Sequence, residues 1–457
     1  MCGVFGAFSP DGKKVLEDVY LGLYALQHRG QEAAGVAWTN AAGGISSHKG
    51  SGLVHLALDQ GDLALIESSC AIGHVRYSTT GGSELSNAQP LTASTSKSAL
   101  AVAHNGNLTN ARGLKLLLEN RGAIFHSSTD TEVLLHLIAH QPHKQPIDAL
   151  LDSLVRLRGA YSIAMIMGDR LIAARDPWGF RPLVLGRRDN IHYVSSETCA
   201  LNLVGAATVR EIEPGEVVII GNEGLSSIRL PVEPKRRFGC AFEFVYFARP
   251  DSVISGRSVY AVRKELGRRL ARRAPCPGAS FATGMPDSGT IASLGYAEES
   301  GIPYEQSVVR NRYVGRTFIE PTNRVRHLGV RIKLNPITEV INGKTVVVVD
   351  DSIVRGTTCQ RMISMIKSCG ASQVHVRISS PPVRFPCYYG IDTPTRVELA
   401  AARMNLRQLE QEVGANSLAY LTEEDLVEAI GLPGNTICTA CFSGDYMEGG
   451  EEFEPQL

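Results

Sequence analysis

The sequence predicts a two-domain protein that combines α/β and α+β architecture, and three features lead to this prediction. The chain of 457 residues is long enough for two or three domains, each with its own core. Four consecutive valines at 346–349 are typical of a strand that is buried on both faces of a parallel sheet. The basic stretch at 234–237 has the composition of a link between domains. We therefore expect domains at 2–232 and 233–457, the second built on the parallel sheet and its flanking helices.

The composition limits the partners of the chain. Its 46 basic and 46 acidic residues balance, so we expect no nucleic-acid or anionic-membrane partner and a small substrate. No stretch reaches the roughly 18 apolar residues of a membrane span, and the start lacks the basic region of a signal peptide. We expect a cytoplasmic protein. Its ten cysteines are scattered, which predicts nucleophiles or metal ligands rather than a disulfide framework.

The valine run leads into a polar loop and then into an apolar-periodic segment, which predicts the order strand, loop, helix. Ligands bind at the carboxyl edge of such sheets, and free N–H groups at a helix start attract phosphate. The hydroxyls of Thr357 and Thr358, with the flexible Gly356, suit a phosphate cradle. Asp350 and Asp351 are too acidic to face phosphate and suit ribose hydroxyls and a magnesium ion.

Paired acids followed by Gly-Thr-Thr resemble the binding signature of phosphoribosyltransferases that use phosphoribosyl pyrophosphate (PRPP). A charged turn of an αβ fold is the plain alternative. Another candidate, the triplet at 343–345, imitates the end of a nucleotide P-loop, but it precedes a strand and lacks the leading glycine.

The resemblance implies roles for residues around this loop. The 5′-phosphate would be held by Ser352, Arg355, Gly356, Thr357 and Thr358. Magnesium would be held by Ser288, Asp350 and Asp351, of which Ser288 lies in a tight loop at 284–290. The segment 311–318 carries basic residues and glycine without strong periodicity, which suits a mobile flap over an anionic ligand, and Arg316 belongs to it.

The first half offers a nucleophile at its second position. Removal of Met1 would leave Cys2 with a free α-amine beside its thiol. The α-amine has a reference pKa of about 7.7–8.0, so it can take the thiol proton and no histidine is needed. A cysteine at this position is weak evidence for catalysis by itself.

Two further segments carry polar residues that have both a plain and a functional interpretation. The strand expected at 100–103 leads into Asn105 and Gly106. An Asn-Gly pair after a strand is usually a turn, yet its side-chain amide and backbone N–H also suit an oxyanion. Asp130 precedes a helix expected at 132–140, where an acid is also plausible as a simple cap.

Together these segments resemble the class II glutamine amidotransferase domain. The resemblance covers about 230 residues and implies an N-terminal-nucleophile hydrolase fold, an αββα sandwich of two antiparallel sheets between helices. It implies Cys2 as nucleophile and Asn105 with Gly106 as oxyanion hole. It also pairs Arg76 with the α-carboxylate of glutamine and Asp130 with its α-ammonium, and the charge signs agree.

The two halves together are similar to the glutamine phosphoribosylpyrophosphate amidotransferase family. That resemblance implies the first committed step of purine biosynthesis, which makes 5-phosphoribosylamine from glutamine, PRPP and water with ammonia passed between two sites. It also implies a type I phosphoribosyltransferase fold in the second half, a homotetramer, and feedback inhibition by AMP and GMP. Glucosamine-6-phosphate synthase and asparagine synthetase are rivals that the central loop disfavours. A regulator that only senses PRPP is also disfavoured, because such a protein would not need the nucleophile Cys2.

The C-x₂-C pair of Cys438 and Cys441 places two thiolates within reach of one centre. The spacing alone leaves an iron–sulfur cluster, zinc and an unmetallated pair equally open. The resemblance extends to the cluster-containing branch of the family, which implies a structural [4Fe–4S] cluster. Its four ligands would be Cys240, Cys387, Cys438 and Cys441.

Two secondary-structure predictions concern the second half. The alternation of Phe242, Phe244 and Tyr246 predicts a strand that packs on a core. Helices are expected at about 397–413 and at 422–430, the latter with Thr422 as its N-terminal cap and a glycine as its stop.

Overall fold

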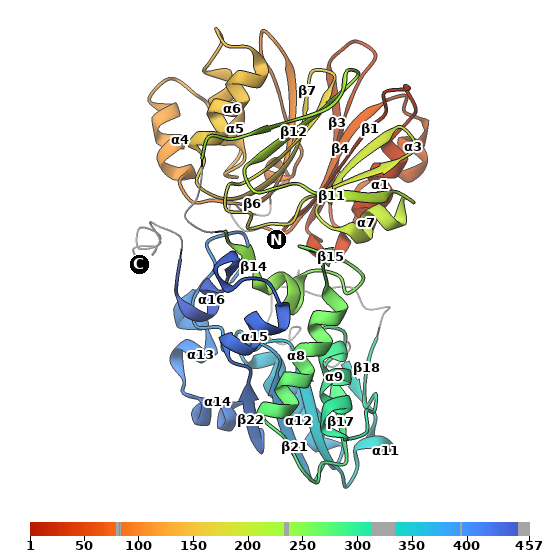
Figure 1. The fold of residues 1–457 in the computed structure, drawn as a ribbon, viewed down its shortest axis with the longest axis vertical. Helices are drawn as coiled ribbons and strands as arrows, with labels where there is room; N and C mark the ends of the chain where they lie inside the picture. Colours follow the sequence, from red (N-terminus) through yellow and green to blue (C-terminus); the bar gives the residue numbers. More distant parts are fainter. Residues whose placement is uncertain (79–81, 83, 233–236, 312–333, 394, 447–457) are drawn as a thin grey trace.

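The structure is a computed structural model that describes residues 1–457 except 79–81, 83, 233–236, 312–333, 394 and 447–457. Two halves stack along the long axis of the molecule, and the N-terminal half occupies the upper part of Figure 1. Arg316 and residues 233–236, which border the predicted domain boundary, lie outside the described residues.

Two antiparallel sheets form the first half. As described, one sheet has the strand order β11 (Ala207–Glu211), β9 (Val184–Arg188), β10 (Ile191–Ser195), β1 (Gly3–Phe8), β4 (Cys70–Arg76), β2 (Ala33–Thr39) and β3 (Ile45–Ser51). The other has the order β13 (Gly224–Arg229), β12 (Glu216–Gly221), β8 (Arg170–Arg175), β7 (Gly159–Met167), β6 (Ala99–Leu108) and β5 (Leu91–Ser94).

Helices cover the outer faces of both sheets. The first sheet is covered by α1 (Leu16–Ala25), α2 (Val54–Ala57), α3 (Gln60–Leu65) and α7 (Thr198–Leu203). The second sheet is covered by α4 (Ala111–Glu119), α5 (Glu132–Ala139) and α6 (Pro146–Arg156). Along β1, Val4 faces the second sheet and Phe5 faces the helices, as the two-residue period of a strand requires. The expected αββα sandwich is confirmed.

A parallel sheet forms the centre of the second half. Its strand order is β17 (Phe281–Gly284), β20 (Thr345–Asp350), β21 (Gln373–Ile378) and β22 (Ser417–Tyr420). Its flanking helices are α8 (Val259–Arg273), α9 (Thr290–Ser300), α12 (Thr357–Ser368) and α14 (Leu406–Val413). Val347 and Val349 of β20 pack against α8 and α9, while Val346 and Val348 pack against α12 and α14. The valine run is therefore buried on both faces, as predicted.

The other described elements of the second half are short, and two of them join distant segments. They are β14 (Gly239–Cys240), β15 (Val253–Ile254), β16 (Arg257–Ser258), β18 (Val308–Arg310), β19 (Leu334–Pro336), α11 (Thr338–Ile341), α13 (Ala400–Arg403), α15 (Glu423–Ile430), β23 (Ile437–Cys438) and α16 (Ala440–Ser443). Strand β14 pairs in parallel with β23, so the start of this half lies beside its last described segment. Thr422 caps α15 through a capping box and Gly431 ends it, as predicted.

Two predictions of local structure are wrong. The strand expected from Phe242 onward is a turn of π-helix, Glu243–Phe247. Four consecutive residues from Phe242 to Val245 are buried, which a strand with one exposed face does not allow. The helix expected at 397–413 is interrupted, because Asn405 forms a capping box that starts α14 afresh.

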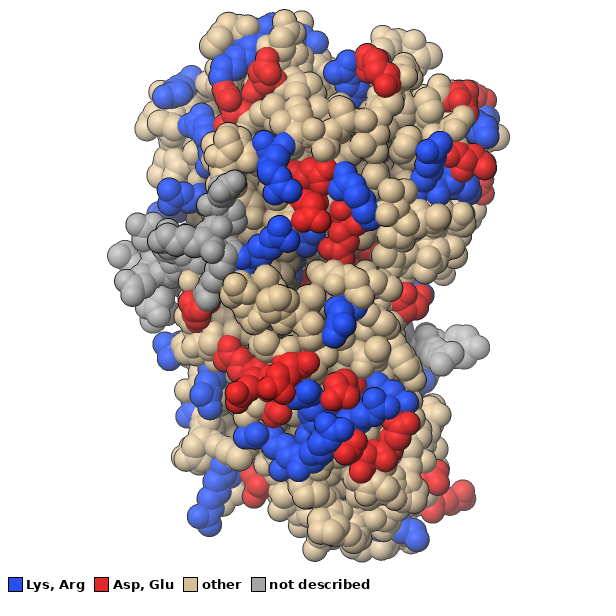
Figure 2. All heavy atoms as spheres, in the orientation of Figure 1, with Lys and Arg blue, Asp and Glu red and all other residues tan. Residues whose placement is uncertain are grey.

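The surface in Figure 2 carries interspersed basic and acidic side chains. Over α8 and α9, arginines and glutamates form exposed pairs such as Arg268 with Glu298 and Arg272 with Glu299. Pairs of this kind contribute little to stability because water and salt screen them. Within the described residues, no helix has both the length and the apolar character needed to cross a membrane.

Candidate functional site

Cys2 immediately precedes β1, the central strand of the first sheet, and it is 7% exposed. Its backbone N–H donates to Asn105 Oδ1 at 3.3 Å. Its Sγ lies 3.5 Å from the carbonyl oxygen of Tyr77. Its own carbonyl accepts from Arg29 Nε at 3.0 Å. The N–H and the carbonyl of the predicted nucleophile are therefore both held by hydrogen bonds.

Asn105 and Gly106 lie within strand β6, so the alternative of a simple turn is wrong. Asn105 is fully buried, and its Nδ2 has no hydrogen-bond partner among the described residues. A buried donor without a partner is costly, and an oxyanion would satisfy it. Gly106 has φ +153°, and a Cβ there would lie 2.0 Å from the carbonyl oxygen of Ala160. Only glycine fits this position.

Arg76 ends strand β4 and is almost fully buried. Its Nη2 donates to the carbonyl oxygen of Gly82 at 2.8 Å, and its Nη1 lies 3.9 Å from Glu32. Asn87 Nδ2 donates both to the Gly82 carbonyl and to Ser128 Oγ, at 3.0 and 2.9 Å. This chain of hydrogen bonds joins Arg76 to the segment that carries Asp130.

Asp130 does not cap helix α5, whose cap residue Thr131 makes no side-chain capping bond. Its Oδ2 accepts from the N–H of Leu108 at 2.7 Å. Its Oδ1 accepts from the hydroxyls of Thr129 and Thr131 at 3.2 and 3.3 Å. Asp130 is thereby tied to the end of β6, the strand of the oxyanion donors. A buried anion in this place suits a cationic group of a ligand.

The predicted phosphate loop joins β20 to α12 in the second half. Gly356 has φ +84° at the start of α12, a conformation that glycine adopts without strain. The side chains of Thr357 and Thr358 are exposed at the first turn of the helix. Arg355 is exposed and pairs with Glu398 at 3.3 Å. Hydroxyls, a guanidinium and free helix N–H groups therefore meet solvent at one sheet edge, where an anion can bind.

The predicted magnesium residues meet at the same edge. Asp351 Oδ1 accepts from Ser288 Oγ and its Oδ2 accepts from Ser352 Oγ, both at 2.6 Å. The N–H of Asp351 donates to Asp350 Oδ1 at 2.9 Å. Burial and the adjacent Asp351 raise the pKa of Asp350 well above its usual value. Two carboxylates and a hydroxyl provide the oxygen donors that magnesium prefers.

The four predicted cluster cysteines line one small cavity between the two halves. The pairing of β14 with β23 sets Cys240 opposite Cys438. Burial raises the pKa of Cys240 to about 11 and holds those of Cys438 and Cys441 higher still, with neighbouring thiols adding to each shift. Metal binding deprotonates such thiols and stabilises the thiolates, so the donor set fits a metal centre.

A single metal ion does not fit this cavity as it stands. Zinc holds its sulfur ligands about 2.3 Å from one point. Among the described residues, no three His, Cys, Asp or Glu side chains converge in that way. The thiols surround a space instead, and an iron–sulfur cluster presents several separate ligand positions.

Sequence reasoning gave no role to four buried charged residues beside Cys2. These are Arg29, Glu197, Arg181 and Glu243. Burial would raise the pKa of Glu197, but His28 and Arg29 hold it well below its usual value. The available signal was a charged residue inside an apolar segment, as Glu243 is between two phenylalanines.

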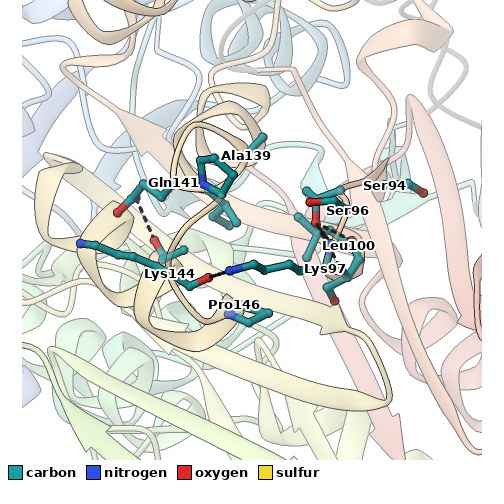
Figure 3. A pocket seen from close by; sticks show the side chains of 13 residues that line it. Ser94, Ser96, Lys97, Leu100, Ala139, Gln141, Lys144 and Pro146 are labelled. Atoms are coloured by element: carbon teal, nitrogen blue, oxygen red, sulfur yellow. Dashed lines mark hydrogen bonds between the residues drawn. The ribbon is translucent and has the colours of Figure 1, made fainter.

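A second hollow, shown in Figure 3, lies away from the predicted sites. It is lined by the end of β5 and the segment that joins α5 to α6, and Lys97 Nζ donates there to the carbonyl of Lys144 at 2.6 Å. It contains none of the predicted site residues.

Comparisons with known proteins agree with the resemblance inferred from the sequence. A family model of the glutamine amidotransferase domain matches residues 74–202. An amidophosphoribosyltransferase of Bacillus subtilis (strain 168) is 46% identical over 450 residues, which cover 97% of this chain and 94% of that protein. An amidophosphoribosyltransferase of Methanocaldococcus jannaschii is 45% identical and covers 98% of this chain and 97% of its own length.

Solved structures give the same answer for the fold. The B. subtilis glutamine PRPP amidotransferase, solved with ADP and GMP, superposes with a TM-score of 0.90 at 46% identity over 97% of both chains. A structure described as the allosteric regulatory enzyme of purine biosynthesis gives a TM-score of 0.91 at 47% identity, over 97% of this chain and 96% of that one. The predicted fold class, with one fold in each half, and the predicted enzyme class are confirmed. The chain belongs to the amidophosphoribosyltransferase family.

Proposed function

We propose that the chain makes 5-phosphoribosylamine from glutamine, PRPP and water, with the glutaminase site in residues 2–232 and the synthase site in 233–457. The observation that carries this proposal is the buried, unpartnered Nδ2 of Asn105 beside Cys2. A donor held in this way beside a thiol suits the tetrahedral intermediate of amide hydrolysis.

The glutaminase half uses Cys2 as the nucleophile once Met1 has been removed. The α-amine takes the thiol proton, and the thiolate attacks the side-chain amide of glutamine. Asn105 Nδ2 and the Gly106 N–H stabilise the oxyanion, ammonia leaves, and water hydrolyses the γ-glutamyl thioester. Arg76 and Asp130 hold the α-carboxylate and α-ammonium of the substrate, so that its amide reaches the thiol.

The synthase half binds PRPP at the carboxyl edge of β20. The 5′-phosphate meets the helix start and the side chains of Ser352, Arg355, Gly356, Thr357 and Thr358. Asp350, Asp351 and Ser288 would hold magnesium, which would neutralise charge on the leaving pyrophosphate. The flap expected to include Arg316 falls outside the described residues, and its proposed role is to shield the site so that ammonia reaches the ribose unprotonated.

Cys240, Cys387, Cys438 and Cys441, which line the cysteine cavity, would hold a [4Fe–4S] cluster. The position of the four cysteines around one cavity, rather than around a single point, supports this assignment over zinc. Such a cluster would stabilise the fold, because its ligands would join the last described segment to β14 and to the loop of Cys387. Neither half-reaction transfers electrons.

We base the proposed regulation and assembly of the enzyme on the family resemblance. The B. subtilis relative was solved with ADP and GMP, which supports purine nucleotides such as AMP and GMP as inhibitors of this enzyme. A homotetramer is the assembly expected for it.

One assay tests the central proposal. Phosphoribosylamine formation is measured with glutamine and then with ammonia, and glutamate release is measured with and without PRPP. We expect synthesis from both nitrogen sources and faster glutamate release with PRPP. Glutamate release without any synthesis would contradict the proposed synthase half, and synthesis from ammonia alone would contradict the glutaminase half.

A second test concerns the cluster. Protein purified without oxygen should be brown and contain iron and sulfide in equal amounts. Cys438→Ser should lose both, along with much of the folded protein, whereas Cys276→Ser, which changes a buried cysteine outside the cavity, should keep them. A colourless, fully active protein with stoichiometric zinc would contradict the assignment.

A further inference from the structure

A group of buried charges lies where the two halves meet. Arg29, Arg181 and Glu197 come from the first half, and Glu243 comes from the π-helical turn of the second half, near β14 and β15 in Figure 1. The exposed fraction of each side chain is 1% or less. Charges buried this deeply are costly unless they are paired in good geometry. Their arrangement is therefore tightly specified by the fold.

Glu243 is the meeting point of this group across the domain junction. Its carboxylate accepts from Arg29 Nη1 and Nη2 at 3.0 and 2.8 Å, and from Arg181 Nη1 at 3.2 Å. Arg29 Nη1 also donates to Glu197. Burial alone would lower the pKa of Arg29, but Glu243 and Glu197 raise it above its usual value. Arg29 therefore stays charged and fixed in orientation.

Arg29 carries this constraint to the nucleophile. Its Nε donates to the carbonyl oxygen of Cys2 at 3.0 Å, next to the bond that joins Cys2 to β1. The two Nη groups face carboxylates, so the planar guanidinium has one orientation in which all these bonds form. A change at Glu243 would therefore turn Arg29 and shift the backbone of Cys2.

We propose that Glu243 is a positioning residue for the glutaminase reaction, through which the synthase half holds Cys2 in place. Glu243 does not touch the substrate, and its carboxylate acts through Arg29. The inference rests on the proposed function, because it concerns the rate at which Cys2 attacks glutamine. It implies that the glutaminase half reaches full activity only when the second half is docked on it.

Further contacts between the two halves, near the oxyanion strand β6, support the same dependence. Asn107 Nδ2, one residue beyond the oxyanion donors, donates to the carbonyl of Tyr388 at 2.9 Å. Arg181 Nε and Nη2 donate to the carbonyl of Tyr389 at 2.9 and 2.6 Å. A Cβ at Gly390 would lie 2.8 Å from the carbonyl carbon of Gly106. The synthase half thus packs against the oxyanion strand as well as against the support of Cys2.

Glu243→Gln in the full-length enzyme tests the proposal, because it keeps the shape of the side chain and removes its charge. We expect kcat for glutamine hydrolysis to fall on the order of 10- to 100-fold, as expected for a misplaced reacting group. The alkylation rate of Cys2 by a chloroketone analogue of glutamine should fall in parallel. The KM for glutamine and the ammonia-dependent synthesis should not change. Glu243→Asp, which keeps the charge, should recover part of the lost rate.

Glu216→Gln is the matched control. Glu216 is buried and accepts two bonds from Arg210 at 2.7 and 2.8 Å, but this pair lies within the first half and makes no bond to Arg29 or Cys2. Its loss should leave the alkylation rate of Cys2 unchanged.

Two outcomes would overturn the proposal. One is normal kcat and normal alkylation in folded Glu243→Gln. The other is an equal loss of glutamine- and ammonia-dependent synthesis, which indicates a purely structural role. If Glu243→Gln does not fold, Glu243→Asp is measured in the same way, and wild-type rates there would refute the inference. Wild-type enzyme that hydrolyses no glutamine would instead refute the proposed function.

Discussion

The two predicted active sites differ in how completely the fold builds them. The glutaminase site lies within paired strands, where Cys2 is 7% exposed and Asn105 is fully buried. The phosphate loop lies at an open sheet edge, where 56% of the Arg355 side chain is exposed. The first site is preorganised by hydrogen bonds inside the protein. In the second site the hydrogen-bond donors are exposed to water until an anion binds. Single substitutions should therefore act on chemistry in the first site and on ligand binding in the second.

The largest effect should come from Cys2→Ala. We expect glutamine-dependent synthesis to fall at least about 10³-fold, as for removal of a catalytic nucleophile. Ammonia-dependent synthesis should survive, because the synthase residues belong to a different sheet. Rates with the two nitrogen sources, measured on one preparation, check this prediction. Equal loss of both activities would show that the two sites are not separate.

Asn105→Ala should have the next largest effect. Loss of one oxyanion donor costs about 10²–10³-fold in kcat in comparable sites. KM for glutamine should change less, because the substrate contacts proposed for Arg76 and Asp130 would remain. The kinetics of glutamate release separate the two parameters. A rise in KM with normal kcat would assign Asn105 to substrate binding instead.

Asp351→Asn tests the open site at the edge of the parallel sheet. The substitution removes the carboxylate that accepts from Ser288 and Ser352, so magnesium and PRPP should bind at least about 100-fold more weakly. Basal glutamate release without PRPP should be unchanged. Titration of synthesis with PRPP at several magnesium concentrations measures the effect. Unaltered PRPP affinity would place the metal elsewhere.

The sequence predicts this open site better than it predicts the supports of the closed one. Consecutive residues supply the strand, the acids and the loop, so local pattern suffices for β20 and for the Thr422 cap of α15. The partners of Arg29, by contrast, lie 168 and 214 positions away along the chain, at Glu197 and Glu243. No local periodicity encodes such contacts.

Tertiary packing also explains the local predictions that were wrong. The alternation of aromatic residues after Cys240 predicts a strand, but the chain instead buries Phe244 and Val245 together and turns Glu243 toward two arginines. Asn105 and Gly106 predict a turn by composition, yet they continue β6 because each pairs with β7. In both places a contact outside the local segment decides the conformation.

The smallest effect should come from Gly356→Ala in the phosphate loop. The position has φ +84°, where an L-residue costs roughly 1–2 kcal/mol. The nearest atom to a new Cβ lies 3.7 Å away, so steric overlap adds nothing. The free energy of unfolding should fall by about that amount, provided that the loop keeps its shape. The KM for PRPP should rise as well, because relaxation of the strain would move the phosphate donors.

Gly414→Ala separates these two consequences. Gly414 ends α14 with φ +75°, and no atom lies within 4 Å of its new Cβ, so its backbone strain matches that of Gly356. It lies outside the phosphate loop. Urea unfolding should therefore give similar losses of stability for the two variants, whereas KM for PRPP should rise only in Gly356→Ala. Equal KM values in both variants would mean that the open loop tolerates movement of its first helical turn, and that ligand binding rather than the apo fold sets the geometry of the phosphate site.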